Sequence, residues 1–263
     1  MKFREIFRFE FVYQARRVRT WLYFAVLFVV AYLLMRTATG GAVFVNSPYA
    51  VAQQTVLTGL LWVLMTPAVA GSAAARDVQT RMHPFIYAAP IRKADYLGGR
   101  FLAAFVLNAL ILLAVPLGML AALLFGVKSE TVGPFPPAVY LSAYGVLALP
   151  TAFTFTAVQF SLAALRRRAV VSYLGTVLFF VTVGATVGVV TNVLRMPTLG
   201  TLLDPTVRII LVIIPETLTP LGLNAALFGL ERSILANRLL WIGVALAILA
   251  FTHVRFRLGD RGA

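Results

Sequence analysis

Long stretches without a single charged residue are the feature that most constrains how this chain can fold. A helix needs about 17–25 residues to cross the hydrocarbon core of a bilayer. Six stretches are close to that length or longer, and each can hold one span: Thr20–Met35, Thr37–Ala75, Phe101–Val127, Thr131–Leu165, Ala169–Leu194 and Leu239–Val254. The first and last are the shortest, but arginines flank both and can extend to the lipid headgroups. With 60% apolar and 12% charged residues, the chain is predicted to be an all-α integral membrane protein with six transmembrane helices.

The basic residues predict which side of the membrane each connection faces. With the N-terminus inside, 17 of the 23 Lys and Arg residues lie in inner segments, which is the bias expected of cytoplasmic loops. The chain is therefore expected in the cell (inner) membrane as a multi-pass protein with both termini cytoplasmic. The net charge of +14 is divided among short segments at helix ends, so it indicates contact with anionic lipid and no nucleic acid partner.

Residues 1–19 are expected to form an amphipathic helix in the inner membrane interface. Plotted at 100° per residue, one face carries Phe3, Ile6, Phe7, Phe11 and Val18. Glu10 and Arg17 fall on the same apolar face, so they are expected to pair with each other or with a neighbour. The sequence leaves open whether this helix rests on lipid or contacts protein.

The segment 195–238 is longer than a turn and only partly polar. Short re-entrant outer helices are expected here, between the fifth and sixth spans. The alternative is a seventh span through Ile209–Leu230, but that would bury Glu216 and place the C-terminal arginines outside. We find no internal repeat or polar linker, so 1–263 is predicted to be a single membrane domain.

The chemistry that the chain lacks excludes several classes of protein. It has no cysteine, and its two histidines, His83 and His253, form no His-Glu-x-x-His motif. It also has no nucleotide-binding Gly-x-x-x-x-Gly-Lys-Ser/Thr loop. We therefore expect no metal, no cofactor and no enzymatic activity in this chain. The six stretches carry no charge, which argues against an ion-coupled secondary transporter or a proton pump.

Uncharged polar residues inside the spans, such as Asn108, Thr156 and Gln159, are expected to hydrogen-bond between helices, or as a group to line a path for an amphipathic substrate. Pro67, Pro116 and Pro150 should interrupt their helices in mid-span. Gly184 and Gly188 form a Gly-x-x-x-Gly pair suited to close helix contact. Since six helices leave a translocation path open on one side, these two glycines are candidate contacts with a second copy of the chain or a homologous half.

The inner connection Arg76–Arg100 carries five basic residues, two acids and several aromatic residues, more than a minimal turn needs. It reads, loosely, as Asp77, Thr80, then Phe85 to Lys93, then Asp95-Tyr96-Leu97-Gly98-Gly99-Arg100. With the six spans and the N-terminal helix, this pattern resembles the permease subunit of an ABC transporter of the type-2 exporter class. Asn237-Arg238-Leu239-Leu240-Trp241 and Arg255-Phe256-Arg257 resemble the subgroup fused to a second permease half and a zinc aminopeptidase.

The resemblance implies an inner coupling segment that sits in a groove of a separate cytoplasmic ABC ATPase subunit. On that basis the residues expected to contact the ATPase are Asp77, Arg81, Phe85, Tyr87, Pro90, Arg92, Lys93, Asp95 and Tyr96. The implied function is export of an unidentified substrate by a pair of permease halves. The main alternative is a membrane anchor or assembly scaffold that transports nothing.

Overall fold

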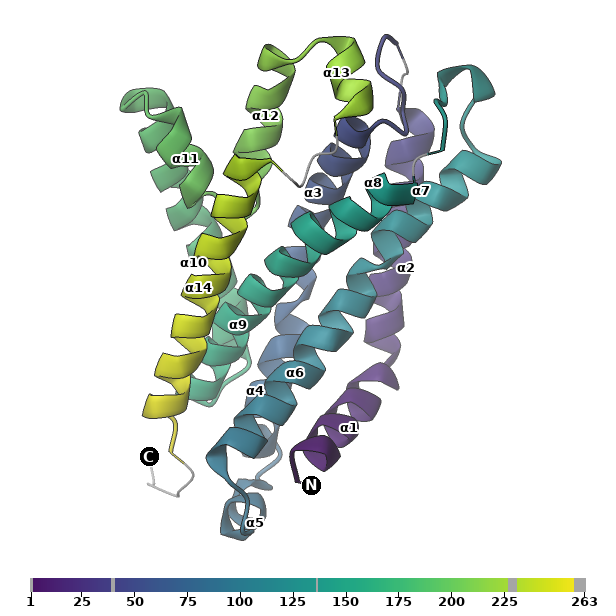
Figure 1. The fold of residues 1–263 in the computed structure, drawn as a ribbon. Coiled ribbons are helices and arrows are strands. Elements are labelled where there is room, and N and C mark those ends of the chain that lie inside the picture. Colours follow the sequence, from purple (N-terminus) through teal and green to yellow (C-terminus); the bar gives the residue numbers. More distant parts are fainter. Residues whose placement is uncertain (1, 39–40, 136, 227–230, 258–263) are drawn as a thin grey trace.

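The computed structural model describes residues 2–38, 41–135, 137–226 and 231–257, and every regular element in these residues is helical (Figure 1). Six helices or helix pairs are long and apolar enough to cross a membrane, which confirms the expected number of spans. They cover Val18–Thr37, Pro48–Gln79, Lys93–Phe125, Pro137–Arg166, Val170–Val193 and Arg232–Arg255. The described part of 195–238 contributes no further span, so the seventh-span alternative is not supported.

The first span is the single helix α2 (Val18–Thr37), and a separate N-terminal helix α1 (Lys2–Ala15) precedes it. The second span consists of α3 (Pro48–Met65) and α4 (Pro67–Gln79). The short helix α5 (His83–Ala88) follows. The third span is α6 (Lys93–Leu112) continued by α7 (Ala114–Phe125).

A 3₁₀ turn, η1 (Ser129–Thr131), leads to the fourth span, which is made of α8 (Pro137–Ser142), the π-helical segment η2 (Ala143–Ala148) and α9 (Leu149–Arg166). The fifth span is α10 (Val170–Gly188) with the π-helical segment η3 (Val189–Val193). Three short helices, α11 (Pro197–Leu203), α12 (Arg208–Thr217) and α13 (Pro220–Ala225), lie between this span and α14 (Arg232–Arg255).

The proline positions explain why three spans are subdivided. Pro67 begins α4, Pro116 lies in the first turn of α7, and Pro150 follows the π-helical segment η2. Proline has no amide hydrogen to donate to the carbonyl four residues earlier, so the regular α-helical ladder is interrupted at each position. The expected mid-span interruptions are therefore present.

The second and fourth spans form the interior of the bundle, while the first, fifth and sixth spans are mostly exposed on its outside. The close packing of α4 follows from its composition, since most residues between Ala68 and Ala75 are alanine or glycine. A Cβ atom at Gly71 would lie only 2.7 Å from Ser172 Oγ on α10. Small residues thus allow α4 to lie in the centre.

Polar residues inside the spans hydrogen-bond between helices. Asn108 Nδ2 donates to Thr156 Oγ1 at 3.0 Å, which joins α6 to α9. Gln159 Nε2 donates to Thr176 Oγ1 at 3.1 Å, which joins α9 to α10. These are the interhelical bonds expected for such residues in lipid, where no water is present to satisfy them.

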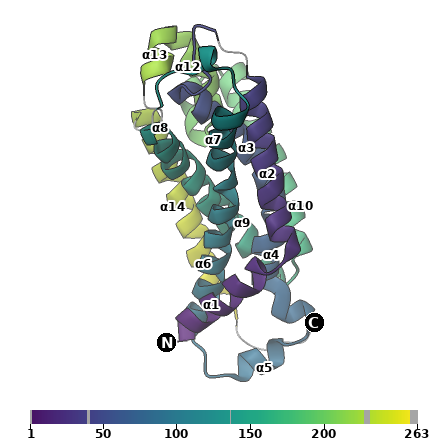
Figure 2. The same cartoon turned by 90° about the vertical axis from the view of Figure 1, so that its right-hand side faces the viewer.

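The two ends of the bundle differ. α1, α5 and the end of α14 lie together at one end, whereas α12 and α13 lie at the other (Figures 1 and 2). Two hydrogen bonds bring the first group together: the Lys2 ammonium donates to the Pro90 carbonyl, and Lys93 Nζ donates to the Phe256 carbonyl at 3.1 Å. The chain therefore places α1 and the end of α14 on the same side of the bundle as the α5 connection.

Candidate functional site

The connection between the second and third spans is shorter than the sequence suggested. α4 continues to Gln79 and α6 begins at Lys93, so only residues 80–92, here called the α5 segment, lie outside the spans. Arg76 and Asp77 therefore lie in the last turn of α4 and Arg100 in the first half of α6. Each lies in a helix or helix pair longer than a membrane crossing needs. These charges are paired with one another and with Glu10 of α1.

The backbone fixes how the α5 segment leaves α4. Arg81 adopts a left-handed conformation with φ 57°, and Met82 N donates to the Asp77 carbonyl at 2.8 Å. This is the arrangement that ends many helices, with arginine in the place usually held by glycine. At the other end, Ala89 is extended, as a residue before proline is expected to be. The segment is thus short and firmly attached at both ends.

The α5 segment projects beyond the end of the bundle (Figure 1). Several of its side chains are exposed. Phe85 is 74% exposed and Met82 is 50% exposed. Arg81, Pro90 and Arg92 are exposed as well. Ile86 and Ile91 pack against the core instead. The side chain of Tyr87 lies outside the described part of the structure.

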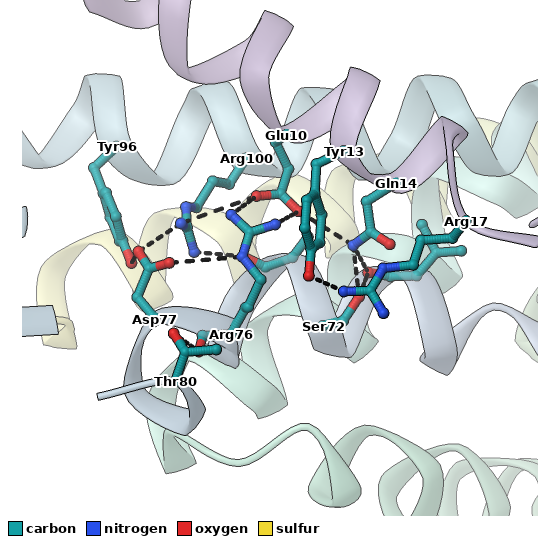
Figure 3. A network of polar contacts seen from close by, with 12 residues as sticks. Glu10, Tyr13, Gln14, Arg17, Ser72, Arg76, Asp77, Thr80, Tyr96 and Arg100 are labelled. Carbon is teal, nitrogen blue, oxygen red and sulfur yellow. Dashed lines mark hydrogen bonds and ion pairs between the residues drawn. The ribbon is translucent and has the colours of Figure 1, made fainter. Parts of the chain in front are cut away.

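Four charged residues, three of them buried and Arg76 partly buried, form what we call the charge network, between α1, α4 and α6 (Figure 3). Arg76 forms a two-pronged contact with Glu10, with Nη2 2.7 Å from Oε2 and Nη1 3.0 Å from Oε1. Asp77 Oδ2 lies 2.5 Å from Arg100 Nη2 and accepts a second hydrogen bond from the Tyr96 hydroxyl at 3.1 Å. Arg100 also approaches Glu10, at 3.9 Å, and donates to the Ala73 carbonyl at 2.9 Å.

The network is tolerated in the interior because its charges cancel. Glu10, Asp77 and Arg100 are each less than 5% exposed, so an unpaired charge at any of these positions would be costly. Burial raises the pKa of the Glu10 carboxyl, and the positive charges of Arg100 and Arg76 oppose that shift. Two acids and two arginines sharing one site keep the site neutral overall.

Further contacts attach α1 along its length. Gln14 Nε2 donates to Ser72 Oγ on α4, and Arg19 Nη2 donates to Gln14 Oε1 at 2.9 Å. The Arg76 guanidinium lies 4.2 Å from the ring centroid of Tyr13, within the range of a cation–π contact. The sequence identified Glu10 as a misfit on an apolar face, and the structure supplies its partners on α4 and α6.

Glycines on α6 let α1 approach closely. A Cβ at Gly99 would lie 3.0 Å from the Phe3 carbonyl and 3.1 Å from Ile6 Cγ2, and one at Gly98 would lie 3.1 Å from the Phe3 ring. Part of the apolar face predicted for residues 1–19 therefore packs on protein. α1 crosses the ends of α4 and α6 before the chain turns into α2 (Figure 2).

The remaining predicted contact residues are divided by the fold. Asp77 and Tyr96 are buried in the network, and the Tyr96 ring stacks on Phe256 with centroids 5.9 Å apart. Lys93 is bonded to the end of α14, and Asp95, in the first turn of α6, is half-buried. A cavity of about 330 Å³ lies beside the network, with Met82, Ile86 and Ile91 of the α5 segment in its lining.

Gly184 and Gly188 lie near the opposite end of the bundle, on α10. No atom would lie within 4 Å of a Cβ added at either position, so neither glycine is packed against a neighbouring helix. Both line a cavity of about 680 Å³ bordered by α9, α10, α11 and α12. Phe155, Phe179 and Phe180 supply aromatic surface, while the polar and charged lining residues are Thr191, Asn192, Asp204, Thr206, Arg208 and Glu216.

The first turns of α14 hold the end of α11 in place. Asn237 Nδ2 donates to the carbonyls of Thr201 and Asp204, at 2.7 and 2.8 Å. Trp241 Nε1 donates to Leu202 O at 3.1 Å. Arg238, expected at the lipid headgroups, is instead buried inside α14 and donates to Thr151 Oγ1 at 2.9 Å. The sequence analysis singled out the motif Asn237–Trp241. That it binds the end of α11 could be seen only in the folded structure.

The fold defines the class of the molecule as a helical membrane protein with six candidate spans. Comparison with models of known protein families finds no match. A search of curated proteins also finds none. The function is therefore argued from the geometry.

Proposed function

We propose that this chain is the membrane permease subunit of an ATP-driven exporter of the ABC type-2 class. In this proposal ATP hydrolysis takes place in a separate cytoplasmic subunit, and the chain itself is not an enzyme. The observation that carries the proposal is the α5 segment, which exposes an aromatic side chain beyond the bundle and is joined directly to α4 and α6. The excess of basic residues in the segments predicted to be inner, 17 of 23, supports a cytoplasmic location for this end.

The exposed side chains of the α5 segment suit a protein contact. Phe85 is an exposed aromatic anchor of the kind that contributes strongly to interfaces when buried in a partner's pocket. Arg81 and Arg92 lie near it in the sequence and are exposed, so they supply charge complementarity. In this proposal these residues contact the ATPase directly, together with Pro90 and Tyr87. Asp77 and Tyr96 act behind them as positioning residues.

The charge network supports a mechanical role for this end of the chain. Because Glu10, Arg76, Asp77 and Arg100 join α1, α4 and α6, a force applied to the α5 segment acts on three helices together. The second and third spans are interrupted near Pro67 and Leu113, where their helical ladders change. Bending at these interruptions is easier than bending inside a regular helix. Motion of the ATPase would thus reach the membrane interior.

The 680 Å³ cavity supports the transport part of the proposal. It has the volume of a small-molecule site and combines aromatic surface with polar groups at one end of the bundle. In this proposal an amphipathic substrate passes along the face of α10 between two permease halves. Gly184 and Gly188 would then lie at or beside the contact between the halves.

Purification of the chain with its cytoplasmic partner tests the proposal. The wild-type chain, extracted in mild detergent, is expected to retain an ATP-hydrolysing subunit. The double variant Phe85→Ala with Arg92→Glu should lose it, since an anchor residue contributes about 2 kcal/mol or more. Phe135→Ala, which removes an exposed phenylalanine at the other end, is the matched control and should retain it. A wild-type chain that inserts correctly but never retains an ATPase would favour the anchor or scaffold alternative.

A further inference from the structure

A groove of about 820 Å³ runs along the face of α1 that points away from the bundle. Its lining side chains recur every three or four residues, so they share one face of the helix. The apolar and aromatic part consists of Phe9, Val12 and Tyr13, and Phe9 is 63% exposed. This face differs from the one that packs on α6 through Phe3 and Ile6.

Three arginines and one acid line the same groove: Arg8, Arg16, Arg17 and Glu5. Arg8 and Arg16 are exposed, and the described residues offer their side chains no hydrogen-bond or ion-pair partner. Arg17 donates to the Tyr13 hydroxyl, and its guanidinium lies 4.5 Å from the centroid of that ring. The groove therefore combines the two unpaired positive charges of Arg8 and Arg16 with an aromatic side chain, Tyr13, that is held in place by Arg17.

The groove is continuous with the surface of the protein that faces lipid hydrocarbon. α1 leads directly into the first membrane span, whose opening turns expose Val18 at 82%, Trp21 at 62% and Leu22 at 57%. Trp21 Nε1 donates to the Ala15 carbonyl at 2.9 Å, which fixes the indole against the end of α1. Tryptophan at such a position marks the level of the lipid headgroups. The arginines of the groove are thus placed next to the headgroups, and the exposed side chains of α2 next to the acyl chains.

We infer that the outward face of α1 binds an anionic phospholipid of the adjacent leaflet, with its phosphate between Arg8 and Arg16 and its acyl chains along the start of α2. Charge complementarity and continuity with the lipid-facing surface of α2 select this occupant. A soluble anion would leave Phe9 and Val12 exposed to water, whereas a phospholipid covers them. The inference depends on the chain spanning a membrane and is independent of any transport function.

The lipid would stabilise the position of α1 from the side opposite to the charge network. Glu10 and Gln14 attach α1 to α4 from within, and the headgroup would contact the other side of the same helix. α1 would then be sensitive to the anionic lipid content of the membrane. Through this site, the lipid composition of the membrane would affect the position of α1, which contacts the helices on both sides of the α5 segment.

Quenching of tryptophan fluorescence by brominated lipids tests the inference on the intact chain. Trp62 and Trp241 are buried, so quenching by lipid reports chiefly on Trp21. The chain is reconstituted into phosphatidylcholine nanodiscs containing an equal mole fraction of brominated phosphatidylglycerol or brominated phosphatidylcholine. The wild type should be quenched more strongly by phosphatidylglycerol. An interfacial arginine adds about 1 kcal/mol to anionic lipid binding, or roughly fivefold, so Arg8→Gln with Arg16→Gln should reduce the preference by roughly 30-fold.

Three controls make the test specific. Arg166→Gln with Arg168→Gln removes the same charge from another exposed site and should keep the preference. Arg8→Lys with Arg16→Lys keeps the charge and should also keep the preference for phosphatidylglycerol. This variant separates the effect of lost charge from an effect of misfolding. Soluble glycerol 1-phosphate should leave the preference unchanged. Equal quenching by both lipids in the wild type, an unchanged preference without Arg8 and Arg16, or competition by glycerol 1-phosphate would each overturn the inference.

Discussion

Asp77 on α4 and Arg100 on α6 form a buried ion pair, with 2.5 Å between Oδ2 and Nη2. The Tyr96 hydroxyl donates to the same carboxylate oxygen, and Glu10 of α1 lies next to Arg100. This pair joins the helix that enters the α5 segment to the helix that leaves it. Because both side chains are almost fully buried, loss of either one would leave the other as a buried charge without its closest partner.

Removal of one partner of this pair should destabilise the chain strongly. Asp77→Asn leaves the Arg100 charge buried without its closest partner, and such a change typically costs about 3–5 kcal/mol. We expect a large drop in the thermal unfolding temperature in detergent. Asp95→Asn, which removes an acid from the first turn of α6, is the matched control and should change stability by about 1 kcal/mol or less. Equal unfolding temperatures for the two variants would show that the pair is not important for stability.

The close approach of α1 to α6 depends on Gly99. Gly99→Val places side-chain atoms where the Phe3 carbonyl and Ile6 now lie, and overpacking of this kind typically costs about 1–3 kcal/mol. We expect α1 to separate from α6, detected as faster amide hydrogen exchange in residues 2–15. Gly243→Val on α14 meets no atom within 4 Å and serves as the control. Unchanged exchange in α1 would contradict the packing described.

The contact between α14 and the end of α11 depends on Asn237. Asn237→Ala removes the donor for the carbonyls of Thr201, Leu202 and Asp204. Since buried carbonyls then lose their partner, a cost of about 1–3 kcal/mol is expected, with faster hydrogen exchange in residues 197–205. Leu239→Ala, at an exposed position of the same helix, should leave this region protected. If both variants exchange alike, the outer helices are held by other contacts.

The contact between two permease halves is predicted to include α10. Gly184→Ile with Gly188→Ile adds bulk where no described atom lies within 4 Å of an added Cβ, so the isolated chain should remain stable while dimer yield in chemical crosslinking falls. Gly243→Ile adds bulk to an open position on α14 and should not reduce the yield. An unchanged dimer yield in the α10 variant would remove α10 from the interface.

The sequence predicted the spans well because their signal is compositional. In lipid, the backbone amide and carbonyl groups of these long uncharged apolar stretches can be paired only if each stretch forms a helix. The number and approximate position of the spans therefore follow from the residues alone. The ends were less accurate, because a paired charge can be buried whereas the prediction treated every charge as a boundary. Arg76, Asp77, Arg100 and Arg238 were treated as boundaries for that reason, and each lies inside a helix that is part of a candidate span.

The candidate site was only partly predictable. The exposed character of Phe85 and Arg92 follows from their place in a short polar connection, and the structure agrees. The burial of Asp77 and Tyr96 depends on where Glu10 and Arg100 come to lie. Glu10 is far from both in sequence, and its only signal was a charge on an apolar helix face. Partners of that kind are set by tertiary packing, which a single sequence does not reveal.

The most direct test of the proposed function is photo-crosslinking from Phe85. A photoreactive phenylalanine analogue at this position, in a cell that makes the chain in its native context, should capture a cytoplasmic protein that also binds a radioactive ATP analogue. The same analogue at Phe135, an exposed phenylalanine at the other end of the bundle, should not capture it. Capture of lipid alone from Phe85, or of the same protein from both positions, would contradict the assignment of the α5 segment as the contact with an ATPase.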